Sequence, residues 1–154
     1  SSNIESIGYD SNSKILEIEF NDHSVYRYYE VPEDVYDGDT VKAIFIRNNE
    51  PMKLSVRLAG IDTPELRPSK KKVGRDIEIQ RAKEARNALI NHISNEKLQI
   101  KFHGPDKYGF RVVGTLYIIN KNNIKEKLNV NQWMIENKYA IEYNGKKKKN
   151  HIWK

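Results

Sequence analysis

Cysteine is missing from the 154 residues of this chain, and so are long apolar runs. Without cysteine the protein has no disulfide and no thiolate zinc site, although this absence does not fix its compartment. No segment is apolar and long enough to span a membrane. No leader peptide is visible, but the chain starts at Ser1 without a methionine. We therefore expect a soluble protein, either secreted after loss of a leader or cytoplasmic.

Apolar residues make up only 38% of the chain, which is low but sufficient for one compact domain of this length. Charged residues account for 31%, and their basic surplus gives a net charge of +6. This surplus has two interpretations of equal weight, which are solubility and binding to polyanions.

The sequence pattern predicts short strands interrupted by two helices. Alternating or β-branched and aromatic residues predict strands over residues 15–20, 24–31, 41–46, 52–58, 98–102 and 111–119. Spacing near 3.6 residues predicts helices over 75–94 and 130–137. The positions with this spacing in the first helix are Ile79, Ala82, Ala85 or Arg86, Leu89, Ile90 and Ile93. Such a mixture favours an α+β, mainly β fold. We expect a five-stranded oligonucleotide/oligosaccharide-binding (OB) barrel with two to three packed helices and an N-terminal antiparallel strand meander.

Two aspartates lie directly beside predicted strand ends. Asp39 belongs to an Asp-Gly-Asp-Thr turn before the strand 41–46, and Asp62 follows the strand 52–58. Backbone neighbours would hold both side chains firmly at these positions. Calcium binds hard oxygen ligands from carboxylates and backbone carbonyls. Asp39, Asp62 and the carbonyl of Thr63 are therefore candidate calcium ligands.

The same region contains groups suited to phosphodiester cleavage. Arg57 alternates with apolar strand residues, so it projects away from their face and can pair bidentately with phosphate oxygens. Glu65 follows a proline that stiffens its approach, and its carboxylate is a candidate base for an attacking water. Arg111 is the candidate for a second arginine that stabilises the charge of the displacement.

Each of these features alone has a simpler interpretation. The acidic turn can be an ordinary capped turn, Thr63 can cap a helix that starts there, and Arg57 can be a solvated strand residue. Lys70 and Lys71 are candidates for nucleic-acid contact, although a solvated loop is the commoner role of such a charge run. Tyr108 can stack on a base or pack over the barrel rim. The combination favours a site, because uncompensated acids would repel phosphate.

Five motifs occur in order between about Val35 and Tyr143, and together they resemble the staphylococcal (micrococcal) nuclease family, also called thermonuclease-like. The motifs are Val35–Val41, Arg57–Glu65, Ala82–Arg86, Asp106–Gly109 and Asn129–Asn131. The resemblance implies an OB barrel and a calcium-dependent endonuclease. It further implies cleavage of DNA and RNA, with single strands preferred, and products that carry a 3′-phosphate.

The resemblance also implies a role for each matching position. The positions that match calcium ligands are Asp39, Asp62 and Thr63. The positions that match the general base and the first phosphate-binding arginine are Glu65 and Arg57. The positions that match the nucleotide-contacting pair are Lys107 and Tyr108.

One residue departs from the family pattern, in which the second arginine directly follows Asp-Lys-Tyr-Gly. Here Phe110 precedes Arg111. A one-residue shift moves a strand side chain to the opposite face, whereas a loop or bulge that takes up the extra residue leaves the next one in place. The downstream pattern fits an insertion in the loop better, so we expect Arg111 in the site; otherwise Phe110 takes that position.

The first part of the chain resembles another family. Residues 1 to about 32 are similar to the start of a KTSC domain, a small domain of poorly defined function, but lack its helix and its Lys-Thr-Ser-Cys end. We expect residues 1–32 to form a truncated strand meander packed on or extending the barrel. Residues 33–150 would then form the nuclease-like domain.

Together these features predict a calcium-dependent hydrolase, a nuclease that cleaves DNA and RNA by metal-assisted water attack, with single strands preferred. The sequence leaves the oligomeric state open and favours a monomer. The alternative is a catalytically weak or inactive nucleic-acid-binding OB module. A third interpretation is an oligomerisation or peptide-binding unit built on the N-terminal strands, whose edge near residues 24–31 can pair with another chain.

Overall fold

The computed structural model describes residues 4–10, 15–20, 25–29, 34–47, 50–94, 96–107, 111–120, 123–146 and 151–154. The strands are β1 (Ile4–Asp10), β2 (Ile15–Phe20), β3 (Val25–Tyr29), β4 (Asp34–Asp37), β5 (Thr40–Arg47), β6 (Glu50–Leu58), β7 (Ile61–Asp62), β8 (Lys97–Pro105), β9 (Val112–Asn120), β10 (Asn123–Asn129) and β11 (Ile141–Glu142). The helices are α1 (Arg75–Ile93) and α2 (Val130–Glu136). In this described part of the chain, neither helix combines the length and the apolar character that crossing a membrane requires.

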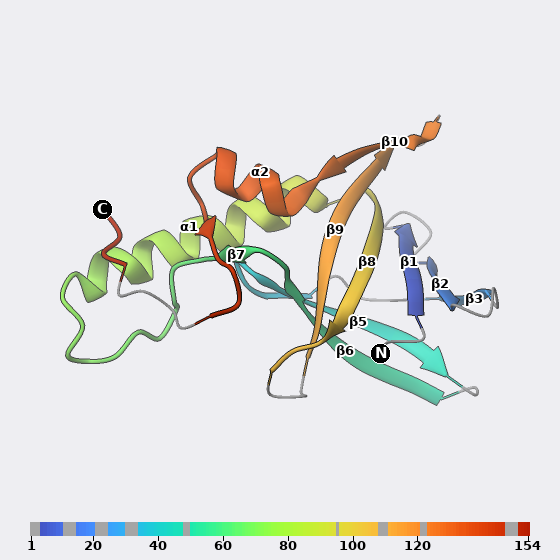
Figure 1. Cartoon of the computed structure of the whole chain (residues 1–154), viewed down its shortest axis with the longest axis horizontal. Coiled ribbons are helices and arrows are strands. Elements are labelled where there is room, and N and C mark those ends of the chain that lie inside the picture. The colour runs from blue at the N-terminus through green and yellow to red at the C-terminus, as the bar shows by residue number, and fades with distance from the viewer. Residues whose placement is uncertain are drawn as a thin grey trace.

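Within the described residues, most of the strands join one mixed sheet of nine strands. Its order is β3-β2-β1-β8-β9-β6-β5-β4, and β10 pairs with β9. β6 and β9 run parallel, with Arg57 opposite Val113, whereas β11 pairs with β7 in a separate two-stranded sheet. Figure 1 shows the two helices at one end of the molecule and the N-terminal strands β1–β3 at the other. The mainly β composition with two helices agrees with the prediction.

The predicted five-stranded closed barrel is not confirmed. β8 pairs with β9 on one side and with β1 on the other, where Ile7 lies opposite Ile100. Because β1 occupies that edge of β8, the described strands continue into the N-terminal meander and form an open sheet. The meander therefore extends the sheet through β1, while the domain division at residues 32 and 33 stays a prediction.

The core lies between the sheet and the two helices. α1 turns Ala82, Ala85, Leu89 and Ile93 toward it at the predicted helical spacing. Glu78 is also buried on this face, where the sequence pattern predicted Ile79. The remaining core side chains are Val41, Val56, Leu58, Ile61, Leu98, Ile100, Leu116, Ile118, Val130, Met134 and Ala140. Full burial of a leucine or methionine contributes about 1.5–3 kcal/mol, so this cluster fixes how β6 and α1 meet.

A buried amide connects α2 to the ends of two strands. The Asn131 side chain accepts from the Leu116 backbone N–H at 3.1 Å and donates to the carbonyls of Ala59 at 2.9 Å and Gly114 at 3.2 Å. Those carbonyls lie just after β6 and within β9. Asn131 was not predicted to be buried, although it belongs to the Asn-Val-Asn motif, and it holds the end of β6 in place.

Replacement of Asn131 by alanine should destabilise the fold. The change removes the side-chain acceptor of the Leu116 N–H and the side-chain donor to the Ala59 carbonyl, so we expect the free energy of unfolding to fall by about 2–4 kcal/mol. Urea denaturation of the full chain measures this loss. Gln132→Ala on the exposed side of the same helix is the matched control, and an equal effect of both variants would contradict the assignment.

The contact between the helices contains a titratable ring. His92 of α1 stacks on Trp133 of α2 with ring centroids 3.7 Å apart. Burial lowers the pKa of His92 below its ordinary value of 6.5, and the nearby Glu96 raises it in part. The neutral ring of His92 therefore stabilises the fold at pH values above 6.5, the pKa of His92 in the unfolded chain. This contribution is lost as the pH falls from 6.5 through the lower pKa of His92 in the folded protein.

A His92→Phe variant should remove this pH dependence. We expect the wild-type melting temperature to fall more steeply than that of the variant between about pH 8 and about pH 5. The reason is that His92 gains a proton in this range and the phenylalanine that replaces it cannot. Thermal unfolding followed by circular dichroism measures both curves. Parallel curves over this range would show that His92 does not titrate in the helix contact.

Candidate active site

Backbone contacts hold the acidic turn against the end of β6. The Leu58 N–H donates to the carbonyl of Asp39 at 2.7 Å, and Thr40 pairs with Arg57 across β5 and β6. The turn itself is closed by the Asp39 N–H, which donates to Asp37 Oδ1 at 3.1 Å. Hence the turn and the arginine, 18 residues apart in sequence, meet at one point of the sheet.

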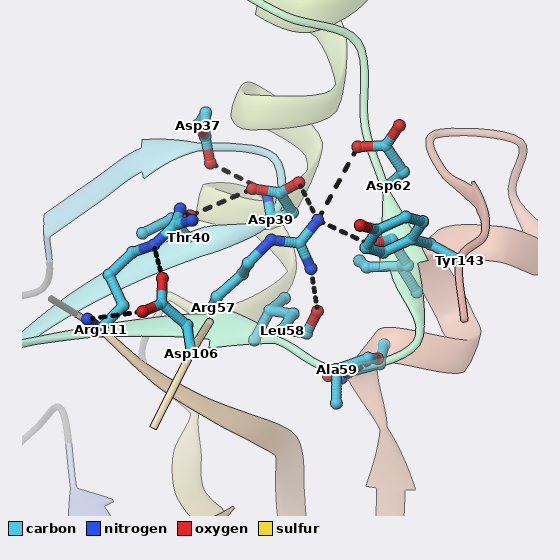
Figure 2. Close-up of polar contacts among 12 residues, drawn as sticks. Asp37, Asp39, Thr40, Arg57, Leu58, Ala59, Asp62, Asp106, Arg111 and Tyr143 are labelled. Atoms are coloured by element: carbon cyan, nitrogen blue, oxygen red, sulfur yellow. Dashed lines mark hydrogen bonds and ion pairs between the residues drawn. The ribbon is translucent and has the colours of Figure 1, made fainter. Parts of the chain in front are cut away.

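Arg57 lies at the centre of this group (Figure 2). Its Nη2 lies 3.4 Å from Asp39 Oδ2 and 3.8 Å from Asp62 Oδ1. The same nitrogen donates to the carbonyl of Ile61 at 3.2 Å, and Nη1 donates to that of Leu58 at 3.3 Å. The side chain is only 12% exposed. The simpler interpretation of Arg57 as a solvated strand residue is therefore wrong.

The two predicted metal-binding carboxylates converge on that guanidinium. Asp39 and Asp62 are 6% and 8% exposed, and Thr63, next to Asp62, is buried as well. Two carboxylates and an adjacent carbonyl are hard oxygen donors that suit calcium, and Arg57 shows that the place between the acids accepts positive charge. Among the residues that the structure describes, no three acidic, histidine or cysteine side chains form a metal-binding group. A cation here would need water or substrate oxygens as further ligands.

Asp37 also belongs to this acidic group, although it was not predicted as a site residue. Its pKa is raised to about 7, first by burial and then by the charge of Asp39. Gly38, between the two aspartates, packs so closely that an added Cβ would lie 3.0 Å from the Cβ of Ala85 in α1. The sequence does contain a signal for Asp37, because two aspartates on either side of a glycine lie in one turn and their carboxyl groups therefore lie close together.

A cavity of about 990 Å³ joins these groups to other candidates. The predicted residues that line it are Asp39, Arg57, Thr63, Glu65, Lys107 and Arg111. Asp62 reaches the group through Arg57 and lines a second cavity of about 540 Å³, which Thr63 and Glu65 line as well. Because α1 begins at Arg75 after Gly74, Thr63 does not cap a helix.

Arg111 lines the main cavity even though the extra residue Phe110 precedes it in the sequence. Beyond the last β8–β9 pair, the Asp106 N–H donates to the carbonyl of Arg111 at 2.7 Å. Nε of Arg111 lies 2.9 Å from Asp106 Oδ2, and Nη1 lies 3.5 Å from the Thr40 hydroxyl (Figure 2). Asp106 therefore fixes the direction of this guanidinium. Phe110 itself lies outside the described residues.

The predicted nucleic-acid contacts have different outcomes. Lys107 is exposed and lines the main cavity. Lys70 and Lys71 are exposed on the loop before α1 and do not line that cavity, although Lys71 lines the second one. Tyr108 lies outside the described residues, and its role stays a prediction.

Tyr143 is an aromatic residue of the cavity that was not predicted. β11 pairs with β7, and the Tyr143 N–H then donates to the carbonyl of Gly60 at 2.9 Å. This pairing places the Tyr143 ring centroid 5.1 Å from Cζ of Arg57. The contact joins residues far apart in the sequence, so no local motif indicates it.

Comparisons with known families agree with this geometry. A family model described as staphylococcal nuclease homologue matches residues 55–154, which is more than half of the chain. A KTSC domain model matches residues 1–38, and residues 39–54 lie between the two matches. A search of curated proteins found no match to this chain. The two family matches show that the chain belongs to the staphylococcal nuclease homologues and that a KTSC segment precedes its nuclease-like part.

Proposed function

We propose that this protein is a calcium-dependent endonuclease that cleaves single-stranded DNA and RNA and leaves 3′-phosphate ends. The observation that carries the proposal is one cavity lined by Arg57, Arg111 and Glu65 beside the buried Asp39. Family membership supports nuclease chemistry in general. The choice of metal, the strand preference and the products rest on the resemblance together with the hard oxygen donors at Asp39, Asp62 and Thr63.

The two arginines would bind the scissile phosphate from two places in the sheet, since Arg57 lies in β6 and Arg111 directly precedes β9. Arg57 is held by two carboxylates and two carbonyls, and Arg111 is held by Asp106. Both guanidinium groups are therefore oriented before substrate binds. Preorganised positive charge of this kind stabilises the additional negative charge that the phosphate acquires during displacement.

Glu65 would act as the general base. Its side chain is exposed and lines the cavity, so it can take a proton from an attacking water. The water oxygen forms a bond to phosphorus, and the bond from phosphorus to the 5′ oxygen breaks. The leaving 5′ oxygen takes a proton from solvent, and the phosphate stays on the 3′ oxygen. Calcium held by Asp39, Asp62 and Thr63 would polarise the phosphate and position the water.

Two side chains that line the cavity would bind the strand. Lys107 supplies positive charge, and Tyr143 presents an aromatic ring on which a base can stack. Lys70 and Lys71 would act at longer range, since they lie outside the main cavity. We assign residues 33–150 to the nuclease-like domain and residues 1–32 to a meander that extends its sheet.

A non-catalytic nucleic-acid-binding module is the second candidate. It is favoured by the ion pairs of Arg57 with Asp39 and Asp62, because they direct the guanidinium toward protein carboxylates. In such a module the acids would serve only to hold the arginine. Binding of a labelled oligonucleotide without cleavage distinguishes this candidate.

Cleavage of denatured DNA should require both calcium and Glu65. We expect Glu65→Gln to lower the rate at least about 100-fold, because the amide cannot accept the proton, while binding of the oligonucleotide persists. Gel assays with calcium, and with a calcium chelator, measure both dependences. If the wild-type rate in calcium does not exceed that of Glu65→Gln while binding persists, the second candidate is correct.

Arg111→Ala tests the second arginine separately. We expect kcat to fall about 100- to 1000-fold, as when a preorganised donor to a transition-state oxygen is removed. Lys83→Ala is the matched control, because Lys83 is an exposed basic residue of α1 and does not line the cavity. A loss below about tenfold for Arg111→Ala would assign the charge stabilisation to another group.

A further inference from the structure

A buried carboxylate connects α1 to both ends of the Glu65 loop. Glu78, in the first turn of α1, is only 2% exposed. Its Oε1 accepts a hydrogen bond from the backbone N–H of Glu65 at 3.2 Å, and its Oε2 forms an ion pair with Nζ of Lys72 at 2.6 Å. The loop between Glu65 and Lys72 is thus fastened at two points to one side chain.

The energetics make this connection specific. Burial removes the hydration of a carboxylate, so a close opposite charge and further hydrogen bonds must replace it. Lys72 supplies the charge, with its side chain 27% exposed, and Glu65 supplies the N–H. The three consecutive lysines therefore differ in their surroundings. Lys70 and Lys71 are exposed, whereas Lys72 contacts Glu78 of α1.

The ion pair of Glu78 and Lys72 also lies close to the C-terminal segment 151–154. Glu78, Lys72 and Glu65 line the second cavity together with Trp153, which is 9% exposed. The carbonyl of Lys154 accepts from Nε of Arg81 on α1 at 2.8 Å, which holds this segment against the helix. Limited contact with water keeps an ion pair strong, so the connection is less screened than a surface pair such as Arg81–Glu84.

We infer that Glu78 is a positioning residue for the general base. It fixes the backbone of Glu65 relative to α1, whose Ala85 also packs against the acidic turn through Gly38. The same helix therefore positions both the backbone of the general base and the acidic turn that bears Asp39. This inference rests on the proposed function for the role of Glu65, whereas the loop attachment can be tested without any activity.

Two double variants separate the attachment from simple stability. Lys72→Met with Glu78→Gln removes both charges but keeps an oxygen that can accept from the Glu65 N–H. Lys72→Met with Glu78→Leu removes both charges and the acceptor, and well-packed apolar replacements of an ion pair are often tolerated. We expect kcat on a single-stranded oligonucleotide to be at least about tenfold lower for the leucine variant, with KM within about twofold, because small displacements of a catalytic group lower the rate.

Hydrogen exchange of the full chain without metal or nucleic acid supplies the second readout. Peptides covering residues 63–73 should exchange about tenfold faster in the leucine variant than in the glutamine variant, while α1 and β9 remain equally protected. Glu84→Gln, which disrupts an exposed ion pair on the same helix, should leave exchange and kcat unchanged. Glu78→Asp offers a third test if the leucine variant does not fold, since its shorter side chain withdraws the acceptor from Glu65 and should lower kcat in the same way.

Equal exchange of residues 63–73 and equal kcat in the two double variants would overturn the inference. A uniform rise of exchange throughout the protein, with kcat per folded molecule unchanged, would also overturn it, because Glu78 would then be only structural. If no variant and no wild-type protein cleaves the oligonucleotide, the proposed function fails, and the exchange of residues 63–73 still decides whether Glu78 holds the loop.

Discussion

The contact of Arg57 with Asp39 and Asp62 is the interaction on which the rest of the site depends. It joins the acidic turn, the end of β6 and the short strand β7, which are the three elements that bear the candidate metal ligands and the first arginine. Two buried carboxylates this close together would be costly without a positive charge between them. The sheet places the arginine there through the pairing of Thr40 with Arg57, so backbone register and electrostatics specify the same arrangement.

The periodic patterns of the sequence predicted which faces of its strands and helices are buried. The alternation around Arg57 and the helical spacing of Ala82, Ala85, Leu89 and Ile93 gave correct faces, because burial follows strand and helix periodicity. Three candidates from the motif run Arg57–Glu65 line one cavity, namely Arg57, Thr63 and Glu65. Asn131 and Tyr143 were missed because their partners lie far from them in sequence, and Glu78 was missed because its partners lie in an irregular loop. Polar contacts of either kind leave no periodic signal. The closed barrel was not confirmed, because the pairing of β1 with β8 depends on which strand occupies an edge, and strand patterns do not encode that.

One arrangement recurs around the cavity. Arg57 is held by Asp39 and Asp62, Arg111 by Asp106, and the Glu65 backbone by Glu78. All four of these supporting carboxylates are buried. In every case a buried acid orients a residue that lines the cavity, and the burial of that acid is favourable only while the contact exists. Such support fixes catalytic groups before substrate arrives, which is the condition under which electrostatic stabilisation is most effective. It also couples stability to function, because loss of one partner leaves an uncompensated charge and releases a catalytic group in the same step.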